Sequence, residues 1–178
     1  LVITGGEPTL QPNLLDFLTQ VQRLGLDVKL DTNGYRPDVL RACLQQGCVD
    51  YVAMDVKSSF ARYDSAAGVR VAVCRVQEAI ADLLHSSIEY EGRTTGGPGL
   101  VDVDDGQAIA TAISAARHYY LQCFRPGKTV GWGDEAPVGA PSAELLQSMA
   151  ELAGHYVQEV GVRGLPTMIS EPVIVSSA

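Results

Sequence analysis

The chain begins with Leu1-Val2-Ile3-Thr4-Gly5-Gly6-Glu7-Pro8-Thr9, an apolar run that breaks into Gly-Gly-Glu-Pro. A short apolar run bounded by glycines is typical of a buried strand. Paired glycines let a backbone approach a ligand closely, and Glu7 adds a carboxylate at the strand's carboxyl end, where open sheets and barrels bind ligands. The stretch therefore predicts a site for a small cationic group such as an amino acid ammonium. A tight strand-to-helix turn with a solvated Glu7 is the alternative, and these residues alone leave both open.

Length and composition indicate one globular domain with a core. The chain has 178 residues, of which 46% are hydrophobic and 19% are charged, and these values are ordinary for a soluble protein. A formal charge of -8 argues against nucleic acid as a partner, because phosphate binding needs clustered Lys and Arg. No apolar stretch of the sequence reaches the length that crosses a membrane, so we expect no membrane partner.

The cysteines give no sign of a metal site. Cys43, Cys48, Cys74 and Cys123 are scattered, without the short spacings that metal sites use. Cys43 and Cys74 fall in helix-like segments, where we expect them to be small core hydrophobes. Free thiols favour a reducing compartment, so we expect a cytoplasmic protein.

Strand-like and helix-like segments alternate along the chain. Apolar residues at helical spacing predict helices over residues 14–24, 37–46, 73–84, 102–116 and 142–156. Apolar runs between them predict strands over residues 1–4, 28–30, 50–57, 88–95, 119–124 and 160–169. This alternation predicts an α/β fold with a parallel sheet and right-handed crossovers. We expect residues 1–169 to form the core and residues 170–178 to be a disordered tail.

Polar residues follow five consecutive predicted strands. They are Glu7, then Asp31 and Asn33, then Asp55 and Lys57, then Arg93 to Thr95, and last Gln122 and Arg125. In a (β/α) barrel these positions share the active-site edge. Acids and bases together suit a zwitterionic ligand. Because the set has no histidine and no Ser or Cys beside a base, the chemistry is expected to come from a bound cofactor.

These motifs resemble those of radical S-adenosylmethionine enzymes. The resemblance rests on five segments in the family's order: Gly5-Gly6-Glu7-Pro8, Leu30 to Gly34, Asp50 to Lys57, Tyr90 to Thr95, and Leu121 to Gly127. It is strongest to the activating proteins of glycyl radical enzymes, of the anaerobic ribonucleoside-triphosphate reductase activating type. It covers roughly residues 1–165.

The resemblance implies a partial (β/α) barrel that binds S-adenosylmethionine. It implies that Gly5, Gly6 and Glu7 hold the methionyl ammonium and that Asp55 and Lys57 hold ribose or carboxylate oxygens. It places Asp31, Thr32 and Asn33 beside the cofactor, with Asp31 and Thr32 near its carboxylate through a monovalent cation. It makes Arg93 an anionic contact near the substrate glycine.

In such enzymes a [4Fe–4S] cluster, reduced by a donor such as flavodoxin or ferredoxin, passes one electron to the sulfonium of S-adenosylmethionine. Cleavage yields methionine and a 5′-deoxyadenosyl radical, which abstracts hydrogen from a glycine of the partner. The implied partner is a glycyl radical enzyme, here an anaerobic ribonucleoside-triphosphate reductase.

The family carries its cluster on C-x-x-x-C-x-x-C, upstream of Gly-Gly-Glu-Pro, and this sequence begins after that point. We therefore expect an amino-terminally truncated chain that lacks the first strand and the cluster loop and is inactive alone. Two alternatives stay open. One is a non-catalytic S-adenosylmethionine-binding module or degenerate fragment, and the other is a small-molecule radical enzyme such as a deazaguanine-forming synthase.

Overall fold

A computed structural model describes residues 1–97, 99–124, 141–165 and 175–176 of the chain. The chain forms two compact units. Unit 1 comprises Leu1–Asp55 and Ala72–Glu91, and unit 2 comprises Val56–Val71 and Gly92–Ala178. None of the helices in the described ranges is long and apolar enough to cross a membrane.

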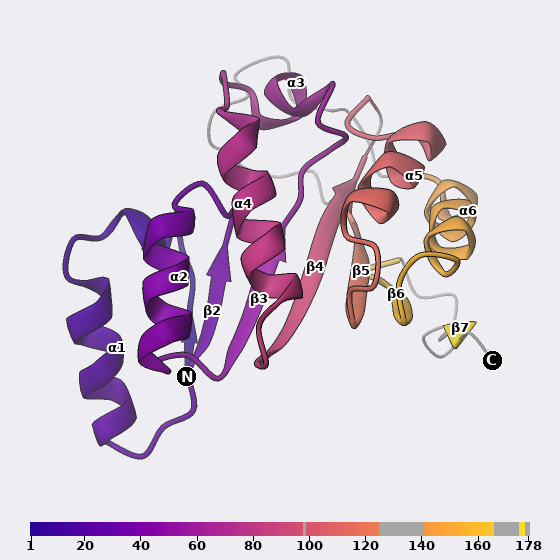
Figure 1. Cartoon of the computed structure of the whole chain (residues 1–178). Coiled ribbons are helices and arrows are strands. Elements are labelled where there is room, and N and C mark those ends of the chain that lie inside the picture. The colour runs from indigo at the N-terminus through magenta and orange to yellow at the C-terminus, as the bar shows by residue number, and fades with distance from the viewer. Residues whose placement is uncertain (98, 125–140, 166–174, 177–178) are drawn as a thin grey trace. The chain divides into compact units, whose positions relative to one another are not determined.

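In unit 1, parallel strands alternate with helices (Figure 1). Its elements are β1 (Val2–Ile3), the 3-10 helix η1 (Pro8–Leu10), α1 (Leu14–Arg23), β2 (Lys29–Thr32), α2 (Pro37–Gln46), β3 (Tyr51–Asp55), α4 (Val73–Leu84) and the first residues of β4 (Glu89–Gly96). β2 pairs in parallel with both β1 and β3, and Leu30 lies opposite Ile3 on one side and Val52 on the other. This order confirms the predicted α/β class.

The strands of unit 1 have one apolar and one polar face. Side chains alternate along a strand, so the buried Leu30, Val52 and Met54 share a face. Figure 1 shows α2 and α4 covering one face of β2 and β3. It is the Met54 face, because the space beside Gly34 is bounded by Met54 and by Ala79 of α4. Asp31 and Asp55 take the opposite face.

The predicted turns of unit 1 are present at the expected positions. Pro37 begins α2, and Gly47 ends it in the left-handed conformation with φ +61°, as helix start and stop signals predict. Gly34 turns the chain after β2 with φ +71°, and a Cβ there would meet the Met54 methyl at 2.1 Å and Ala79 at 3.1 Å. Only glycine fits this turn without displacing core atoms.

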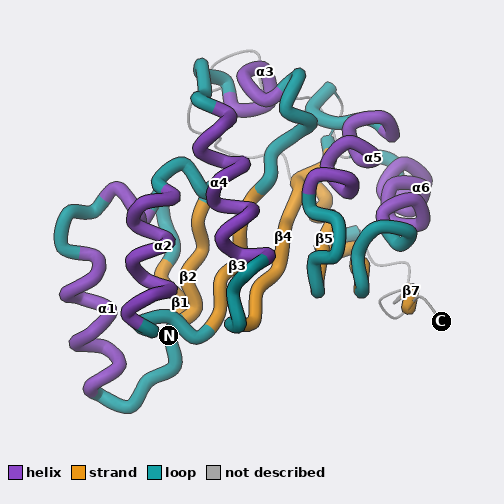
Figure 2. The backbone as a smooth tube through the Cα atoms, in the orientation of Figure 1, coloured by secondary structure: helices purple, strands orange, loops and turns teal. Residues whose placement is uncertain are grey.

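Unit 2 contains a second set of strands and helices. Its elements are α3 (Tyr63–Ala67), the later residues of β4, α5 (Val103–Ala112), β5 (His118–Cys123), α6 (Ala143–Ala153), β6 (Glu159–Arg163) and β7 (Val175–Ser176). β5 and β6 are parallel, and β7 is antiparallel to β6. Figure 2 shows loops connecting β4 to α5 and α5 to β5, the same strand–helix alternation as in unit 1.

In unit 2, glycines of α5 and β4 let α6 pack closely against these two elements. A Cβ on Gly106 of α5 would lie 3.0 Å from atoms of Met149, and one on Gly96 of β4 would lie 2.4 Å from Leu146, both residues of α6. Tyr119 of β5 and Leu146 and Met149 of α6 are completely buried. The small residues therefore allow α6 to pack closely against its neighbours.

The structure corrects several sequence-based expectations. Cys43 is buried as predicted, but Cys74 in α4 is exposed. The sequence pattern missed the short elements η1, α3 and β7, because elements of two to five residues are too short to show a period. Of the last predicted strand, 160–169, the described part is present as Glu159–Arg163, and residues 166–169 lie outside the described residues. Of the tail at 170–178, only Val175 and Ser176 lie within the described residues, and they pair with β6, so the expected disorder stays a prediction.

Candidate functional site

The Glu7 carboxylate links two loops at the carboxyl ends of β1 and β2. Its Oε1 accepts hydrogen bonds from the Thr9 amide at 3.1 Å, from the Thr9 hydroxyl, and from the Thr32 hydroxyl at 2.8 Å. Its Oε2 accepts one from the Asn33 amide at 2.7 Å. Glu7 is the N-cap of η1, and Pro8 lies in the first turn, where proline is favoured.

The loop after β2 is fixed from within as well. The Thr32 hydroxyl, besides donating to Glu7, accepts from the Gly34 amide at 3.1 Å, and the Asn33 side chain accepts from the Tyr35 amide at 3.0 Å. Such Asx and Ser/Thr contacts are typical of tight turns. Glu7, Thr32 and Asn33, three of the predicted site residues, are thus brought together in unit 1.

Gly5 and Gly6 leave the turn before Glu7 open. Gly5 has φ +136°, and a Cβ on either residue would meet no atom within 4 Å. A cavity of about 420 Å³ adjoins this turn, and Gly6, Glu7 and Phe17 are among its lining residues. Exposed backbone groups beside a carboxylate are the chemistry that an amino acid ammonium requires. The residues present therefore fit the amino group of S-adenosylmethionine.

Strand alternation separates Asp31 from Thr32. Asp31 and Asp55 lie on the polar face of β2 and β3, whereas Thr32 lies on the helix-covered face and is 3% exposed. Side chains of neighbouring residues in a strand point to opposite faces of the sheet. Asp31 and Asp55 thus share a face, while the Thr32 side chain is directed toward Glu7 and Gly34.

Two further predicted site residues, Lys57 and Arg93, belong to unit 2, whereas Arg125, predicted at the end of the fifth strand, lies outside the described residues. The Lys57 amide donates to the Tyr63 hydroxyl at 3.3 Å. The backbone on either side is tied to β4, since the Val56 amide donates to the Arg93 carbonyl at 2.8 Å and the Thr94 hydroxyl donates to the Val56 carbonyl at 2.7 Å. The segment that carries Lys57 is therefore held against the strand that carries Arg93.

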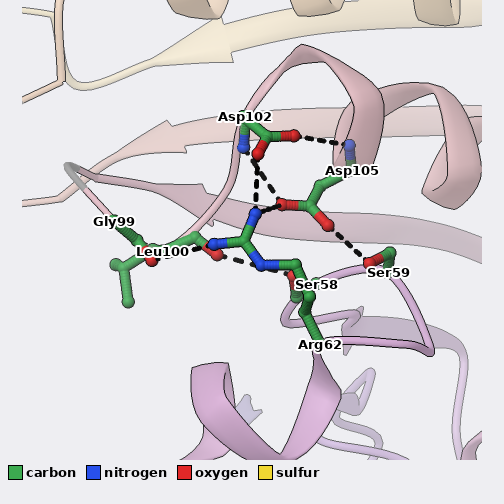
Figure 3. A network of polar contacts seen from close by, with 7 residues as sticks. All are labelled: Ser58, Ser59, Arg62, Gly99, Leu100, Asp102 and Asp105. Carbon is green, nitrogen blue, oxygen red and sulfur yellow. Dashed lines mark hydrogen bonds and ion pairs between the residues drawn. The ribbon is translucent and has the colours of Figure 1, made fainter.

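A second carboxylate, Asp105, organises the loops of unit 2 (Figure 3). It accepts hydrogen bonds from the Ser59 hydroxyl at 2.5 Å, from the Arg62 guanidinium at 2.5 Å and from the Asp102 amide at 3.2 Å. Asp102 in turn accepts from the Asp105 amide at 2.9 Å and from Arg62 at 2.7 Å. This reciprocal pair is a capping box at the start of α5, and Asp105 is only 3% exposed.

The described residues do not provide ligands for an iron–sulfur cluster. The described part of the chain holds no group of three or more His, Cys, Asp or Glu placed to bind a metal. Burial raises the pKa of the Cys43 thiol to about 12 and also raises that of Cys48.

Sequence reasoning missed Thr9 as a member of the site. It is buried, and its amide and hydroxyl both contact Glu7. The available signal was local: an acid followed by Pro and Thr is typical of a capped turn. The Arg62–Asp105 contact had no such signal, because 43 residues separate the partners.

Known proteins resemble this chain in sequence and in structure. A protein of Methanocaldococcus jannaschii, provisionally named a glycyl-radical enzyme activating enzyme, is 29% identical over 168 residues, which cover 92% of this chain and 70% of that protein. A domain of pyruvate-formate lyase-activating enzyme from Bacteroides vulgatus matches with a TM-score of 0.70 at 16% identity, over 92% of this chain and 98% of that one.

A structure of TYW1 with a lysine-pyruvate adduct bound matches with a TM-score of 0.61 at 14% identity, over 98% of this chain and 55% of that one. At such identities these likenesses show the fold alone, which is the α/β partial barrel that the family resemblance implied. The family model of the radical SAM superfamily matches residues 1–111, more than half of the sequence. The chain belongs to the radical SAM superfamily.

Proposed function

We propose that the chain is the S-adenosylmethionine-holding part of an activating enzyme for a glycyl radical enzyme. The observation that carries the proposal is the open Gly5-Gly6 turn beside Glu7, whose carboxylate contacts only neutral donors within the described residues. The activating role is supported by the names of two similar proteins, the relative from Methanocaldococcus jannaschii and the activating-enzyme domain from Bacteroides vulgatus.

In this proposal, the residues of unit 1 hold the amino acid part of the cofactor. Gly5, Gly6 and Glu7 contact the ammonium. Asp55 holds ribose oxygens, and Asp31 lies beside the carboxylate with a monovalent cation between them. When bound, S-adenosylmethionine supplies the radical that such enzymes transfer.

Lys57 and Arg93, which belong to unit 2, are proposed as contacts for anionic oxygens. The proposed partner is an anaerobic ribonucleoside-triphosphate reductase, with a flavodoxin or ferredoxin as electron donor, in the cytoplasm. Superfamily membership implies a [4Fe–4S] cluster as well, with ligands outside the described residues.

Titration of the chain with S-adenosylmethionine, followed by heteronuclear NMR, tests the binding function. We expect the amide signals of Gly5, Gly6 and Asn33 to shift as the cofactor fills the turn, while amides of α6 stay in place. Absence of any shift at millimolar cofactor would contradict the proposal.

Titration with a purified anaerobic ribonucleoside-triphosphate reductase tests the proposed partner separately. Broadening of the chain's signals in proportion to added reductase is the expected result. Cofactor binding without an effect of the reductase would retain the binding function and reject this partner.

A further inference from the structure

We propose that Thr9 and Thr32 are positioning residues for the Glu7 carboxylate. Their hydroxyls hold Oε1 of Glu7 and thereby leave Oε2 to face the cationic group of the ligand. This inference rests on the proposed function, and it adds a residue, Thr9, that the sequence motifs do not include.

The two oxygens of the Glu7 carboxylate accept hydrogen bonds from different numbers of donors. A carboxylate oxygen offers about two acceptor sites. Oε1 of Glu7 has three donors, the Thr9 amide, the Thr9 hydroxyl and the Thr32 hydroxyl. Oε2 has a single donor among the described residues, the Asn33 amide. The chain therefore saturates Oε1 and leaves acceptor capacity on Oε2.

The two hydroxyls are placed to act on Glu7 and not on a ligand. Thr9 is 1% exposed and Thr32 is 3% exposed, whereas Glu7 itself is partly exposed. The Thr32 hydroxyl uses its hydrogen for Glu7 and a lone pair for the Gly34 amide. Thr32 also points to the opposite face of β2 from Asp31, so its side chain is not the neighbour of a ligand on the Asp31 face.

The charge of Glu7 is not balanced within the described residues. Its four hydrogen bonds come from two amides and two hydroxyls, and no Lys, Arg or His of the described ranges forms an ion pair with it. Neutral donors hold a carboxylate in place without cancelling its charge. A fixed oxygen with residual negative charge is suited to an ammonium.

Removal of each hydroxyl tests the inference. Thr32→Val and Thr9→Val are expected to weaken binding of S-adenosylhomocysteine about tenfold in the NMR titration, a change of about 1.4 kcal/mol. Binding of 5′-methylthioadenosine, which lacks the ammonium and carboxylate, is expected to stay within about twofold because the carboxylate acts on the ammonium. Thr32→Ser and Thr9→Ser, which restore a hydroxyl, are expected to recover wild-type affinity for both.

A matched control is Thr19→Val in α1, where the hydroxyl donates to the Leu15 carbonyl of its own helix at 2.9 Å. We expect it to change neither affinity. Equal weakening of both ligands by Thr32→Val and Thr9→Val would overturn the inference and indicate a general structural role, as would unchanged binding of both.

The outcomes also separate the inference from the proposed function. Wild-type protein that binds neither S-adenosylmethionine nor S-adenosylhomocysteine contradicts both. Wild-type binding with no selective loss in the Val variants retains the function and rejects the positioning role. If one Val variant fails to fold, the other variant and the Ser pair decide the question, because Thr9 and Thr32 lie on different segments.

Discussion

Glu7 in unit 1 and Asp105 in unit 2 are two carboxylates with similar surroundings and different charge balance. Each accepts hydrogen bonds from at least one hydroxyl and at least one backbone amide, and each ties together two loops that follow strands. Asp105 additionally receives the Arg62 guanidinium and is buried. Glu7 has only neutral donors among the described residues and remains partly exposed beside an open turn.

The difference identifies which cluster is suited to bind a ligand. A buried carboxylate that pairs with a guanidinium has its charge compensated, so it serves the scaffold. A fixed carboxylate without a cation retains its charge for a ligand. By this criterion Asp105 holds the loops of unit 2 in place, and Glu7 is the acid that a ligand meets.

We expect the largest loss of stability when the Asp105 carboxylate is removed. Asp105→Ala removes the acceptor of Ser59 and Arg62 and half of the capping box, so we expect unfolding free energy to fall by about 2–4 kcal/mol. Chemical denaturation measures it. Asp104→Ala, an exposed acid in the same helical turn, is the control and should change stability by less than about 0.5 kcal/mol.

The next effect concerns the turn that presents Asn33 to Glu7. Gly34→Ala adds a methyl at φ +71° within 3.1 Å of Ala79, so we expect a loss of about 2–3 kcal/mol from backbone strain and crowding together. Gly25→Ala, at φ +75° with no atom within 4 Å, should lose only the backbone strain, about 1 kcal/mol. Equal losses would show that the Gly34 turn is not crowded.

Much of this arrangement could be predicted from sequence, because it depends on local chemistry. Asn33-Gly34 predicts a turn, Pro37 and Gly47 delimit a helix, and Asp102 marks the start of another. Apolar period and strand ends then indicate the α/β class and the edge where Glu7, Asp31 and Asp55 fall. The alternation of side chains along β2 can also be read from the sequence, and it places Asp31 and Thr32 on opposite faces of the strand.

Contacts between distant segments could not be predicted. The choice of Thr32 and Asn33 as donors to Glu7 depends on the parallel register of β1 and β2. The pairing of Arg62 with Asp105 depends on how two loops pack. Neither hydrophobic periodicity nor local propensity indicates which distant side chains come together. Whether a cation pairs with Glu7 or with Asp105 can therefore be seen only in the structure.

Glu7→Gln should have a smaller effect on stability than Asp105→Ala. The amide side chain retains one acceptor oxygen and loses the other, so we expect a loss of about 1 kcal/mol in unfolding free energy. Thermal denaturation of the two variants side by side measures the difference. A larger loss of unfolding free energy for Glu7→Gln than for Asp105→Ala would show that Glu7 mainly stabilises the fold, and would contradict the contrast between the two acids.

We expect the smallest effect from Asp102, whose ionised side chain contributes to folding stability and is protonated at low pH. The backbone amide of Asp105, followed by the charge of Arg62, lowers the pKa of Asp102 below its usual 3.8. Its contribution is therefore fully present above about pH 4 and is lost as the pH falls through the lowered pKa. Asp102→Asn keeps an N-cap and should reduce the acid-induced loss of stability by about 0.2–0.5 kcal/mol, a small amount because the side chain is exposed. Denaturation curves at about pH 6 and about pH 3 measure it, and an unchanged slope would contradict the assignment.

An NMR titration of wild-type and Glu7→Gln chains with S-adenosylmethionine tests directly whether Glu7 contacts the ammonium of this cofactor. We expect shifts at Gly5, Gly6 and Asn33 in the wild type and binding weakened about tenfold or more in the variant, a change of about 1.4 kcal/mol. Binding of 5′-methylthioadenosine is expected to stay unchanged. Equal affinity of both chains for S-adenosylmethionine, or shifts confined to other residues, would contradict it.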